Sequence, residues 1–597
     1  MYMTYVADSP SLLKESRPFG VKINISSEFR PTWLVRTSDM ERVPGTEAIH
    51  GYCTLSYSWN YSGDIFPGEN GKYEFFDHGK HRIIFKKNIK KRNGENDEGE
   101  EQEKEEQEKE KADPSSFLDH HEIKEVKFEQ LVQQVCKDFD IDYIWYDKIC
   151  IDQNDKAAKH AEIARMHKIY QNAFYTVAMI PEMAIPDKFK DTSLTWKDSF
   201  TTITGGDFTS ITNNDEVEEK RDIIKKCLVD IGQSQWLRRL WTLEEAIMSN
   251  YIVFVGRNTH LWDTHRMASA ARSLGFDNEI SDNLFELKGR CDRYSANFIL
   301  RHAHARSTTK EHDRAFALGN IFHNLMDVKV DYGLPLDTVL SNFYSDLIEK
   351  DLSVLCFGKA RDTYKSTIKV IHHLPSWTGI EGAHVSRELK SQLKDQEIQG
   401  IIKIDRRKKV GTKRDDDDDN DNNEIQKDRL HLNNIRFIAA KPRHFPLVKE
   451  DLNIPFKTPF DTTMDHRLLQ IRDIGTEITH YITELTSDPV QHEKMDRQMM
   501  ESVIPPGRHH PVTFLSLMEE CDECMILDLP FSMGVKSPSS RIYPVIRKVE
   551  QNGQGGDSSL YKSIGVFFFR CRSFYLHRRP KFSKFTNDVR EGSFVIV

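Results

Sequence analysis

Carboxylate, hydroxyl and aromatic side chains gather directly after two short apolar runs. The run at residues 143–146 ends in Asp147, and the loop behind it carries Asp152. The run at residues 52–55 ends in Ser-Tyr-Ser-Trp at residues 56–59. In open α/β sheets, ligands bind outside the carboxyl ends of parallel strands, where loop side chains converge. The two strand ends therefore predict a ligand pocket.

The elements that would position these groups alternate between strand and helix. The predicted strands are residues 52–58, 141–146, 174–180 and 251–255. The predicted helices, chosen by apolar stripes at helical spacing, are residues 122–139, 156–172, 217–231 and 238–249. Such alternation favours an α/β fold with a parallel sheet flanked by helices.

The length of 597 residues and the changes in local composition along the chain predict several parts. The predicted parts are a lead segment (1–50), an α/β domain (51–260), a helical extension (261–355) and a mixed, partly β C-terminal domain (356–597). A mixed-charge tract at 86–112 and an acidic loop at 415–423 have no apolar face. Both tracts are predicted to be solvated insertions.

Composition excludes several classes of protein. The net charge of −9 gives no reason to expect nucleic acid as a partner. Nine scattered cysteines suit a reducing compartment, and neither a secretory signal nor a membrane-length apolar run is present. Cys521-Asp-Glu-Cys524 lacks a second ligand pair, so no metal is expected. We therefore expect a cytoplasmic protein with no membrane contact.

Four motifs together carry a resemblance to a known family. They occur in one order along the chain: Leu55-Ser-Tyr-Ser-Trp59, Ile144-Trp-Tyr-Asp-Lys-Ile-Cys-Ile-Asp-Gln153, Ile169-Tyr-Gln-Asn-Ala173 and Trp236-Leu-Arg-Arg-Leu-Trp-Thr-Leu-Glu-Glu245. In this order they resemble the heterokaryon incompatibility (HET) domain of fungi, over about residues 51–255. The block at 306–319, with Val330-Asp-Tyr332 after it, resembles the segment found behind that domain in such proteins.

Two positions depart from the family pattern. Asn60 stands where the family usually has Gly after the first strand, and Glu244 stands where it most often has Gln. Asn tolerates a left-handed backbone better than other non-glycine residues, so the turn at Asn60 is expected to survive.

The resemblance also implies a fold and a reaction. The HET domain is similar to the Toll/interleukin-1 receptor (TIR) domain, a five-stranded parallel sheet with flanking helices. Enzymatic TIR domains cleave NAD with a glutamate in a Trp-x-x-x-Glu arrangement, and Trp241-Thr-Leu-Glu-Glu245 has that arrangement. By this match Glu245 is the catalytic carboxylate, NAD is a substrate, and no cofactor is required. The family further implies allorecognition, innate immunity and programmed cell death, with protein partners or self-association.

A carboxylate at this place suits the chemistry. Cleavage of a nicotinamide–ribose bond passes through an oxocarbenium-like state, which a negative charge stabilises. Trp241 and Glu245 share a helix face, so that the indole could partly desolvate the carboxylate. The structural alternative packs Trp241, Leu240 and Leu243 in the core and turns Glu244 and Glu245 to water.

The strand-end residues have two interpretations as well. As substrate-binding groups, Asp147 or Asp152 would bind ribose hydroxyls, Tyr57 or Trp59 would stack on a base, and Ser56 would contact phosphate. As structural groups, Asp152 caps the helix that begins near Lys156, and Asp147 fixes its loop. Alternate residues of the first strand would then simply face the core.

Two interpretations of the whole chain therefore stay open. In one, the HET-like domain is an enzyme that signals by consuming NAD. In the other, it is a non-enzymatic interaction or oligomerisation module. In either, the C-terminal domain could be the sensor for the HET-like output.

Overall fold

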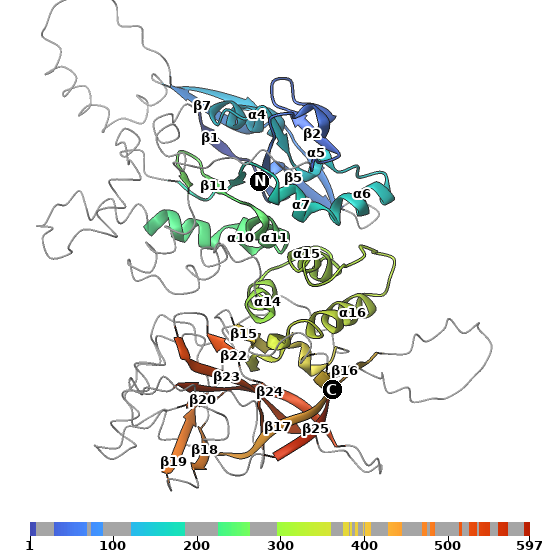
Figure 1. The fold of residues 1–597 in the computed structure, drawn as a ribbon. Helices are drawn as coiled ribbons and strands as arrows, with labels where there is room; N and C mark the ends of the chain where they lie inside the picture. The colour runs from blue at the N-terminus through green and yellow to red at the C-terminus, as the bar shows by residue number, and fades with distance from the viewer. Residues whose placement is uncertain are drawn as a thin grey trace, which may run out of the picture. The chain divides into compact units, whose positions relative to one another are not determined.

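The computed structural model forms two compact units (Figure 1). Unit 1 comprises Met1–Phe276 and Leu284–Lys288, and unit 2 comprises Asp277–Asn283 and Gly289–Val597. The structure describes residues 1–7, 29–67, 73–86, 121–184, 225–262, 295–359, 374–380, 382–384, 389–391, 398, 400–406, 428–443, 468–473, 478–483, 513–515, 524–529, 531–533, 537–549, 559–570 and 590–597. The acidic loop at 415–423, nearly all of the charged tract at 86–112 and Cys521 lie outside these ranges.

Unit 1 is built on a seven-stranded sheet of order β12-β11-β10-β4-β9-β2-β3. The strands are β2 (Trp33–Arg36), β3 (Glu41–Pro44), β4 (Cys53–Ser56), β9 (Tyr143–Trp145), β10 (Thr176–Met179), β11 (Ile252–Val255) and β12 (His260–Trp262). The four central strands β11, β10, β4 and β9 are parallel, and the edge strands are antiparallel. All four were predicted from their β-branched and aromatic runs, so the mixed α/β character is confirmed for this unit. The sheet nevertheless has seven strands with antiparallel edges, whereas the resemblance implied five parallel strands.

The chain order creates a reversal beside β4. From β4 the chain crosses to β9 on one side, and then to β10 and β11 on the other. The carboxyl ends of β4, β9 and β10 therefore meet at the point where the winding changes direction. This is the place in an open α/β sheet where ligands bind.

The two faces of the sheet are covered by different helices. Ser56 and Trp145 point to one face, where Trp145 packs on Tyr170 of α7 (Met166–Gln171) and α7 packs on α11 (Trp241–Met248). Tyr57 points to the other face and packs on Phe128 of α4 (Phe128–Asp138), with a ring distance of 5.1 Å. Since successive strand residues alternate between faces, Ser56 and Tyr57 serve opposite sides of the sheet.

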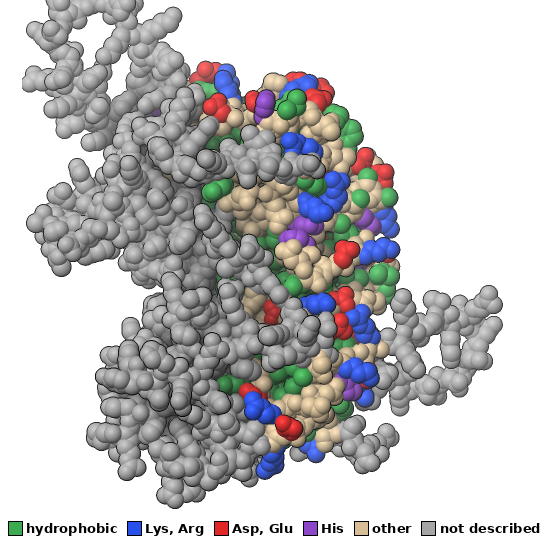
Figure 2. All heavy atoms as spheres, viewed as in Figure 1, with side chains coloured by type: hydrophobic (Ala, Val, Ile, Leu, Met, Phe, Trp, Pro, Cys, Tyr) green, Lys and Arg blue, Asp and Glu red, His purple; other side chains and the backbone are tan. Residues whose placement is uncertain are grey.

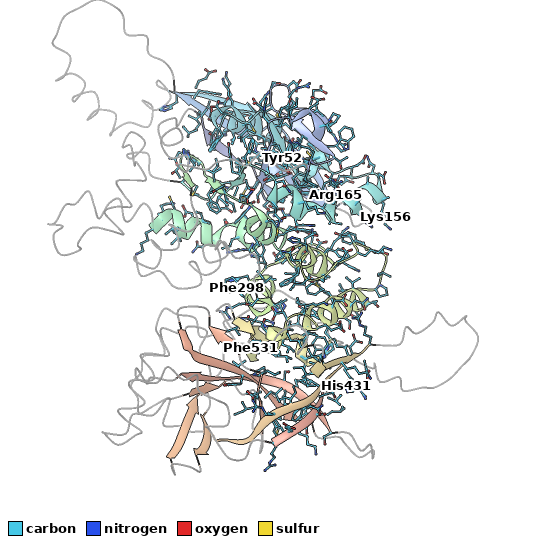
Figure 3. The ribbon with its side chains drawn as sticks, in the orientation of Figure 1. Tyr52, Lys156, Arg165, Phe298, His431 and Phe531 are labelled. Carbon is cyan, nitrogen blue, oxygen red and sulfur yellow. The ribbon has the colours of Figure 1, made fainter. Side chains whose placement is uncertain are left out.

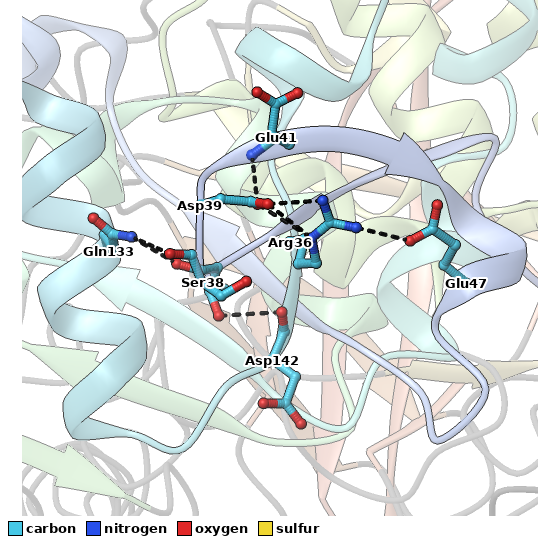
Figure 4. Close-up of polar contacts among 8 residues, drawn as sticks. Arg36, Ser38, Asp39, Glu41, Glu47, Gln133 and Asp142 are labelled. Atoms are coloured by element: carbon cyan, nitrogen blue, oxygen red, sulfur yellow. Dashed lines mark hydrogen bonds and ion pairs between the residues drawn. The ribbon is translucent and has the colours of Figure 1, made fainter.

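Residues 33–44 extend the sheet beyond the domain start predicted at residue 51. β2 and β3 form a hairpin whose turn is fixed by Arg36, which bonds Asp39 at 2.7 Å and Glu47 at 3.2 Å (Figure 4). The Gln133 side chain donates from α4 to the Thr37 and Ser38 carbonyls. The hairpin thus ties the lead segment to both β9 and α4.

A smaller sheet of order β1-β7-β8 lies before α4. Its strands are β1 (Thr4–Val6), β7 (His81–Lys86) and β8 (His121–Val126), and a separate hairpin joins β5 (Asp64–Pro67) to β6 (Tyr73–Phe76). Residues 122–126, predicted as the start of a helix, are therefore part of strand β8, and the helix begins at Phe128. Along the chain, the charged tract falls between the antiparallel strands β7 and β8, and its prediction as an insertion lies almost wholly outside the described residues.

The predicted helix at 156–172 is divided into α6 (Lys156–Ile163) and α7. Asp155 caps α6, because its carboxylate accepts from the Ala157 and Ala158 amides. Asp152, predicted as the cap, instead accepts from the Asn154 and Asp155 amides in the preceding loop. Tyr52, labelled in Figure 3, donates to the Ile169 carbonyl at 2.8 Å and fixes α7 against the start of β4.

Unit 2 begins with three helices, α14 (Ala296–His304), α15 (Asp313–Ile321) and α16 (Leu336–Ile348). Asp313 accepts from Tyr332 at 2.6 Å and from Thr308 at 3.0 Å, whereas Arg314 donates to Glu311 at 2.6 Å. The two halves of the motif at 306–332 thus meet in one polar cluster.

Among the described residues beyond α16, strands predominate, which agrees with the prediction of a mixed, partly β domain. Five strands close into a barrel in the order β17-β21-β23-β24-β25 and back to β17. They are β17 (Arg429–Arg443), β21 (Cys524–Leu527), β23 (Ser537–Lys548), β24 (Leu560–Arg570) and β25 (Arg590–Ile596). Helix α16 is joined to the start of β17, because Ser341 and Ser345 both donate to buried Asp428.

The described surface carries mixed charge. Lys and Arg side chains are interspersed with Asp and Glu over the face displayed in Figure 2. Within the described ranges, no helix is both long enough and apolar enough to cross a membrane. No group of three or more His, Cys, Asp and Glu side chains in those ranges is placed to hold a metal ion.

Candidate functional site

Ser56 and Glu245 meet at the carboxyl end of the central strand. The Ser56 hydroxyl, on the last residue of β4, donates to Glu245 Oε2. It also accepts a hydrogen bond from Trp236 Nε1 at 2.6 Å. The three side chains come from β4, from α10 (Gln235–Arg238) and from α11. The site therefore joins two of the predicted residues, Ser56 and Glu245, with Trp236, which was not predicted as a site residue.

A line of buried hydroxyls holds α11 against the sheet. Thr54 and Thr176 on neighbouring strands share a hydrogen bond of 2.7 Å, and Thr176 is bonded in turn to Ser249. Ser249 ends α11 and donates to the Glu245 carbonyl at 2.5 Å. At the other end of the helix, Thr242 donates to the Trp236 carbonyl at 2.5 Å. Helix α11 is fixed at both ends, so Glu245 is held in one orientation.

Both glutamates of α11 are buried. Glu245 is 7% exposed and Glu244 is 0% exposed, and Leu240 and Leu243 are buried with them. The structural alternative that turned the glutamates to water is therefore wrong. A buried carboxylate needs hydrogen bonds, and Ser56 supplies one to Glu245. Burial raises the pKa of Tyr170, and the Glu245 charge contributes to the same shift, which places this phenol near the carboxylate.

A second group of side chains surrounds Asp147 at the end of β9. Trp59 Nε1 donates to Asp147 Oδ2 at 2.7 Å. Arg239 donates to the Tyr57 carbonyl at 2.9 Å, and its positive charge acts on Asp147. Its neighbour Arg238 is exposed. Tyr57, Trp59 and Asp147 are thus brought together by the structure, with Arg239 as a fourth member.

Asp147 is buried, which makes the charged form of its carboxyl group unfavourable. Burial raises the pKa of its carboxyl group, and the Arg239 charge and the Trp59 hydrogen bond oppose that rise. The Tyr57 hydroxyl lies close enough to oppose it slightly as well, but without the geometry of a hydrogen bond. Asp147 Oδ1 and the Tyr57 hydroxyl are both buried with no hydrogen-bond partner among the described residues. An unmet donor and an unmet acceptor therefore lie in the same region.

This raised pKa has a consequence for stability. A carboxyl whose pKa is higher in the folded state favours folding when it is protonated, so its contribution is lost as pH rises from about 4 through the folded pKa. We expect Asp147→Asn, which cannot ionise, to gain stability relative to wild type across that window. Thermal unfolding of both proteins between pH 4 and pH 7 measures the difference. A difference that does not change with pH would contradict it.

A third carboxylate, which no sequence motif assigned, lies beyond β10. Glu182 Oε1 accepts hydrogen bonds from the Tyr61 hydroxyl at 2.6 Å and from the backbone N–H of Gln235 at 3.1 Å. Its other oxygen, Oε2, is buried with no hydrogen-bond partner in the described part of the chain. Glu182 lies three residues beyond the end of β10, as Asp147 lies two beyond the end of β9, so the same strand-end signal could have found it.

The segment directly after β4 is the 3-10 helix η2 (Trp59–Ser62), and it joins the three groups. Trp59 reaches Asp147, Tyr61 reaches Glu182, and the Asn60 amide donates to the Gln235 side chain at 3.0 Å. The left-handed turn considered for Asn60 is not formed, because its backbone is part of the 3-10 helix. Gly63 instead takes the positive φ, of 143°.

Two other predicted site residues, Asp152 and Trp241, lie near the ends of helices α6 and α11. Asp152 accepts hydrogen bonds from two amides of its own loop, and these bonds lower its pKa. Trp241 is half-exposed at the start of α11, and the indole that reaches the Ser56–Glu245 pair belongs to Trp236. The thiol of Cys150 is buried, and burial raises its pKa to about 12, which disfavours a nucleophilic thiolate.

Comparisons with known proteins bear on the same part of the chain. No curated protein and no solved structure matches it. Residues 52–245 match the model of the family described as heterokaryon incompatibility protein (HET). The matched segment runs from the residue before β4 to Glu245 itself, and it contains Ser56, Asp147, Glu182 and Trp236. This match supports the assignment of residues 52–245 as a HET domain.

Proposed function

We propose that this chain is a signalling protein of the heterokaryon-incompatibility and programmed-cell-death type, acting in the cytoplasm through protein partners or self-association. The match of residues 52–245 to the HET family supports this role. The HET domain is the output part in this proposal, and unit 2, with its helices and closed barrel, is the part that senses the trigger.

We further propose that the HET domain cleaves NAD at a TIR-like site. The observation that carries this proposal is the contact between Ser56 and Glu245 at the carboxyl end of β4. The central strand order β9-β4-β10-β11 supports it, because flavodoxin-like sheets have this order and bind ligands beside the first strand.

Each residue has a defined part in the reaction. The Glu245 carboxylate stabilises the positive charge that develops on the ribose as the nicotinamide bond breaks. Ser56 is a positioning residue, since it donates to Glu245 and receives a hydrogen bond from Trp236. Neutral nicotinamide leaves with the bonding electrons, and water then attacks the ribose carbon and releases a proton, which gives ADP-ribose.

The burial of the same residues supports a second candidate. Ser56 is 1% exposed and Trp236 is 0% exposed, so this network also seals α11 against the sheet. In a non-enzymatic module these contacts would have a structural role only, and the domain would act by oligomerisation. Substrate could reach Glu245 only after a movement of the surrounding segments.

Nicotinamide release separates the two candidates. The full chain is incubated with NAD at millimolar concentration, both as a dilute sample and under conditions that promote assembly. For an enzyme, we expect free nicotinamide and ADP-ribose in equal amounts. An assembled sample that leaves NAD intact would favour the non-enzymatic module.

A further inference from the structure

Two carboxylates flank β4 in the same arrangement. Asp147 lies beyond β9 on one side, and Glu182 lies beyond β10 on the other. Each has one oxygen held by an aromatic donor from η2, since Trp59 Nε1 bonds Asp147 and the Tyr61 hydroxyl bonds Glu182. A single short helix thus orients both carboxylates at the edge of the sheet where ligands bind.

The second oxygen of each carboxylate has no donor in hydrogen-bonding geometry within the described ranges. Asp147 Oδ1 and Glu182 Oε2 are both buried, and neither has a hydrogen-bond partner among the described residues. The Tyr57 hydroxyl, 3% exposed and beside Asp147, is also without one. Buried polar atoms are nearly always paired, so unmet acceptors at a ligand edge call for donors from another molecule.

We propose that Asp147 and Glu182 are paired hydroxyl-binding carboxylates, one on each side of β4, and that together they select a ligand with two ribose groups. Ribose hydroxyls are the donors that a carboxylate takes in nucleotide sites of α/β sheets. The Tyr57 hydroxyl can donate to a ribose oxygen that itself donates to Asp147 Oδ1. Arg239, which donates to the Tyr57 carbonyl beside Asp147, would supply a positive charge for the phosphates of such a ligand.

This inference rests on the proposed NAD site, but it concerns binding and not cleavage. It adds Glu182, which no sequence motif assigned, to the ligand-binding residues. It also predicts that the site binds dinucleotides more tightly than mononucleotides. A dinucleotide such as NAD or its product ADP-ribose offers two diols, whereas AMP offers one. Both carboxylates would contribute to binding the first class, and only one of them to binding AMP.

Both unmet oxygens are buried in this structure, so entry of such a ligand requires a movement of the segments that cover them. Helix η2 keeps its bonds to the other oxygen of each carboxylate, through Trp59 and Tyr61. The segment is thus the scaffold of the site, and the ligand hydroxyls would bind to the free oxygens.

The test is calorimetric titration of the full chain with ADP-ribose and with AMP. Glu182→Gln keeps an oxygen for Tyr61 and Gln235 but replaces the free acceptor with an amide donor. Asp147→Asn does the same beside Trp59. We expect each substitution to weaken ADP-ribose about tenfold or more, since loss of one charge-assisted hydrogen bond has this effect. Only one of these two substitutions should weaken the binding of AMP.

Two further variants serve as controls. Glu125→Gln removes an exposed carboxylate of β8 and should leave both affinities unchanged. Tyr61→Phe frees Glu182 to rotate without changing its charge, and should weaken ADP-ribose about threefold even if Glu182→Gln fails to fold.

The outcomes are separable from those of the NAD assay. An unchanged affinity of the folded Glu182→Gln variant for ADP-ribose would overturn the inference. It would mean that Glu182 Oε2 binds only water. Wild-type protein that binds no ADP-ribose at millimolar concentration would overturn it too. Binding that depends on Glu182 without nicotinamide release would refute cleavage alone. Release combined with Glu182-independent binding would refute this inference alone.

Discussion

Replacement of Glu245 by Gln is expected to lower nicotinamide release by at least about 100-fold, the size of effect seen when one preorganised electrostatic group is removed from an active site. Gln has the shape of Glu and can still accept from the Ser56 hydroxyl, so the contact with β4 persists. The variant loses the negative charge facing the oxocarbenium-like ribose. The change should therefore appear in kcat, while ADP-ribose affinity changes little.

The neighbouring glutamate provides the matched control. Glu244 lies on the same helix and is 0% exposed, but the Ser56 hydroxyl is bonded to Glu245 and Trp236 instead. Glu244→Gln introduces the residue that HET domains most often have there and should leave release unchanged. If Glu245→Gln retains wild-type release, or if both substitutions reduce it equally, the central carboxylate is not Glu245.

Replacement of Trp236 by Ala is expected to destabilise unit 1 by about 3–5 kcal/mol, the usual cost of removing a large aromatic side chain from a core. Trp236 is 0% exposed and packs edge-on against Phe254 of β11, with ring centroids 5.6 Å apart. Calorimetric unfolding should show the transition of this unit lowered by about 10 °C, given the size of the domain.

Two variants separate packing from hydrogen bonding. Trp236→Phe keeps most of the ring but removes the N–H group that bonds Ser56, and should cost about 1 kcal/mol. Trp241→Ala removes the same residue type at a half-exposed position and should cost clearly less than Trp236→Ala. Equal losses at positions 236 and 241 would mean that Trp236 does not anchor the site.

The central strands and their polar ends could be predicted from sequence because they depend on local patterns. A β-branched run with a carboxylate or hydroxyl behind it identifies both β4 with Ser56 and β9 with Asp147. The same pattern at the end of β10 indicates Glu182, although this residue follows Pro181 and precedes a segment with a loop-like composition. Strand identity is fixed by neighbours in the chain, so it is visible in the sequence.

The remaining features depend on contacts between distant residues. Exposure is the commonest state of a helical Glu, and only the packing of α11 on the sheet buries Glu244 and Glu245. Local sequence patterns do not indicate that β2 and β3 extend the sheet edge. Nor do they indicate that β17 pairs with β25, about 160 residues further along the chain. The helical state of Asn60 likewise depends on its bond to Gln235.

The most direct measurement is a crystal structure of the full chain with a carba-NAD analogue, whose nicotinamide bond cannot be cleaved. We predict that the nicotinamide ribose lies at the carboxyl end of β4, within hydrogen-bond distance of Glu245. Analogue bound elsewhere, or a site in which Ser56, Trp236 and Glu245 keep their mutual bonds and no analogue enters at millimolar concentration, would contradict this prediction.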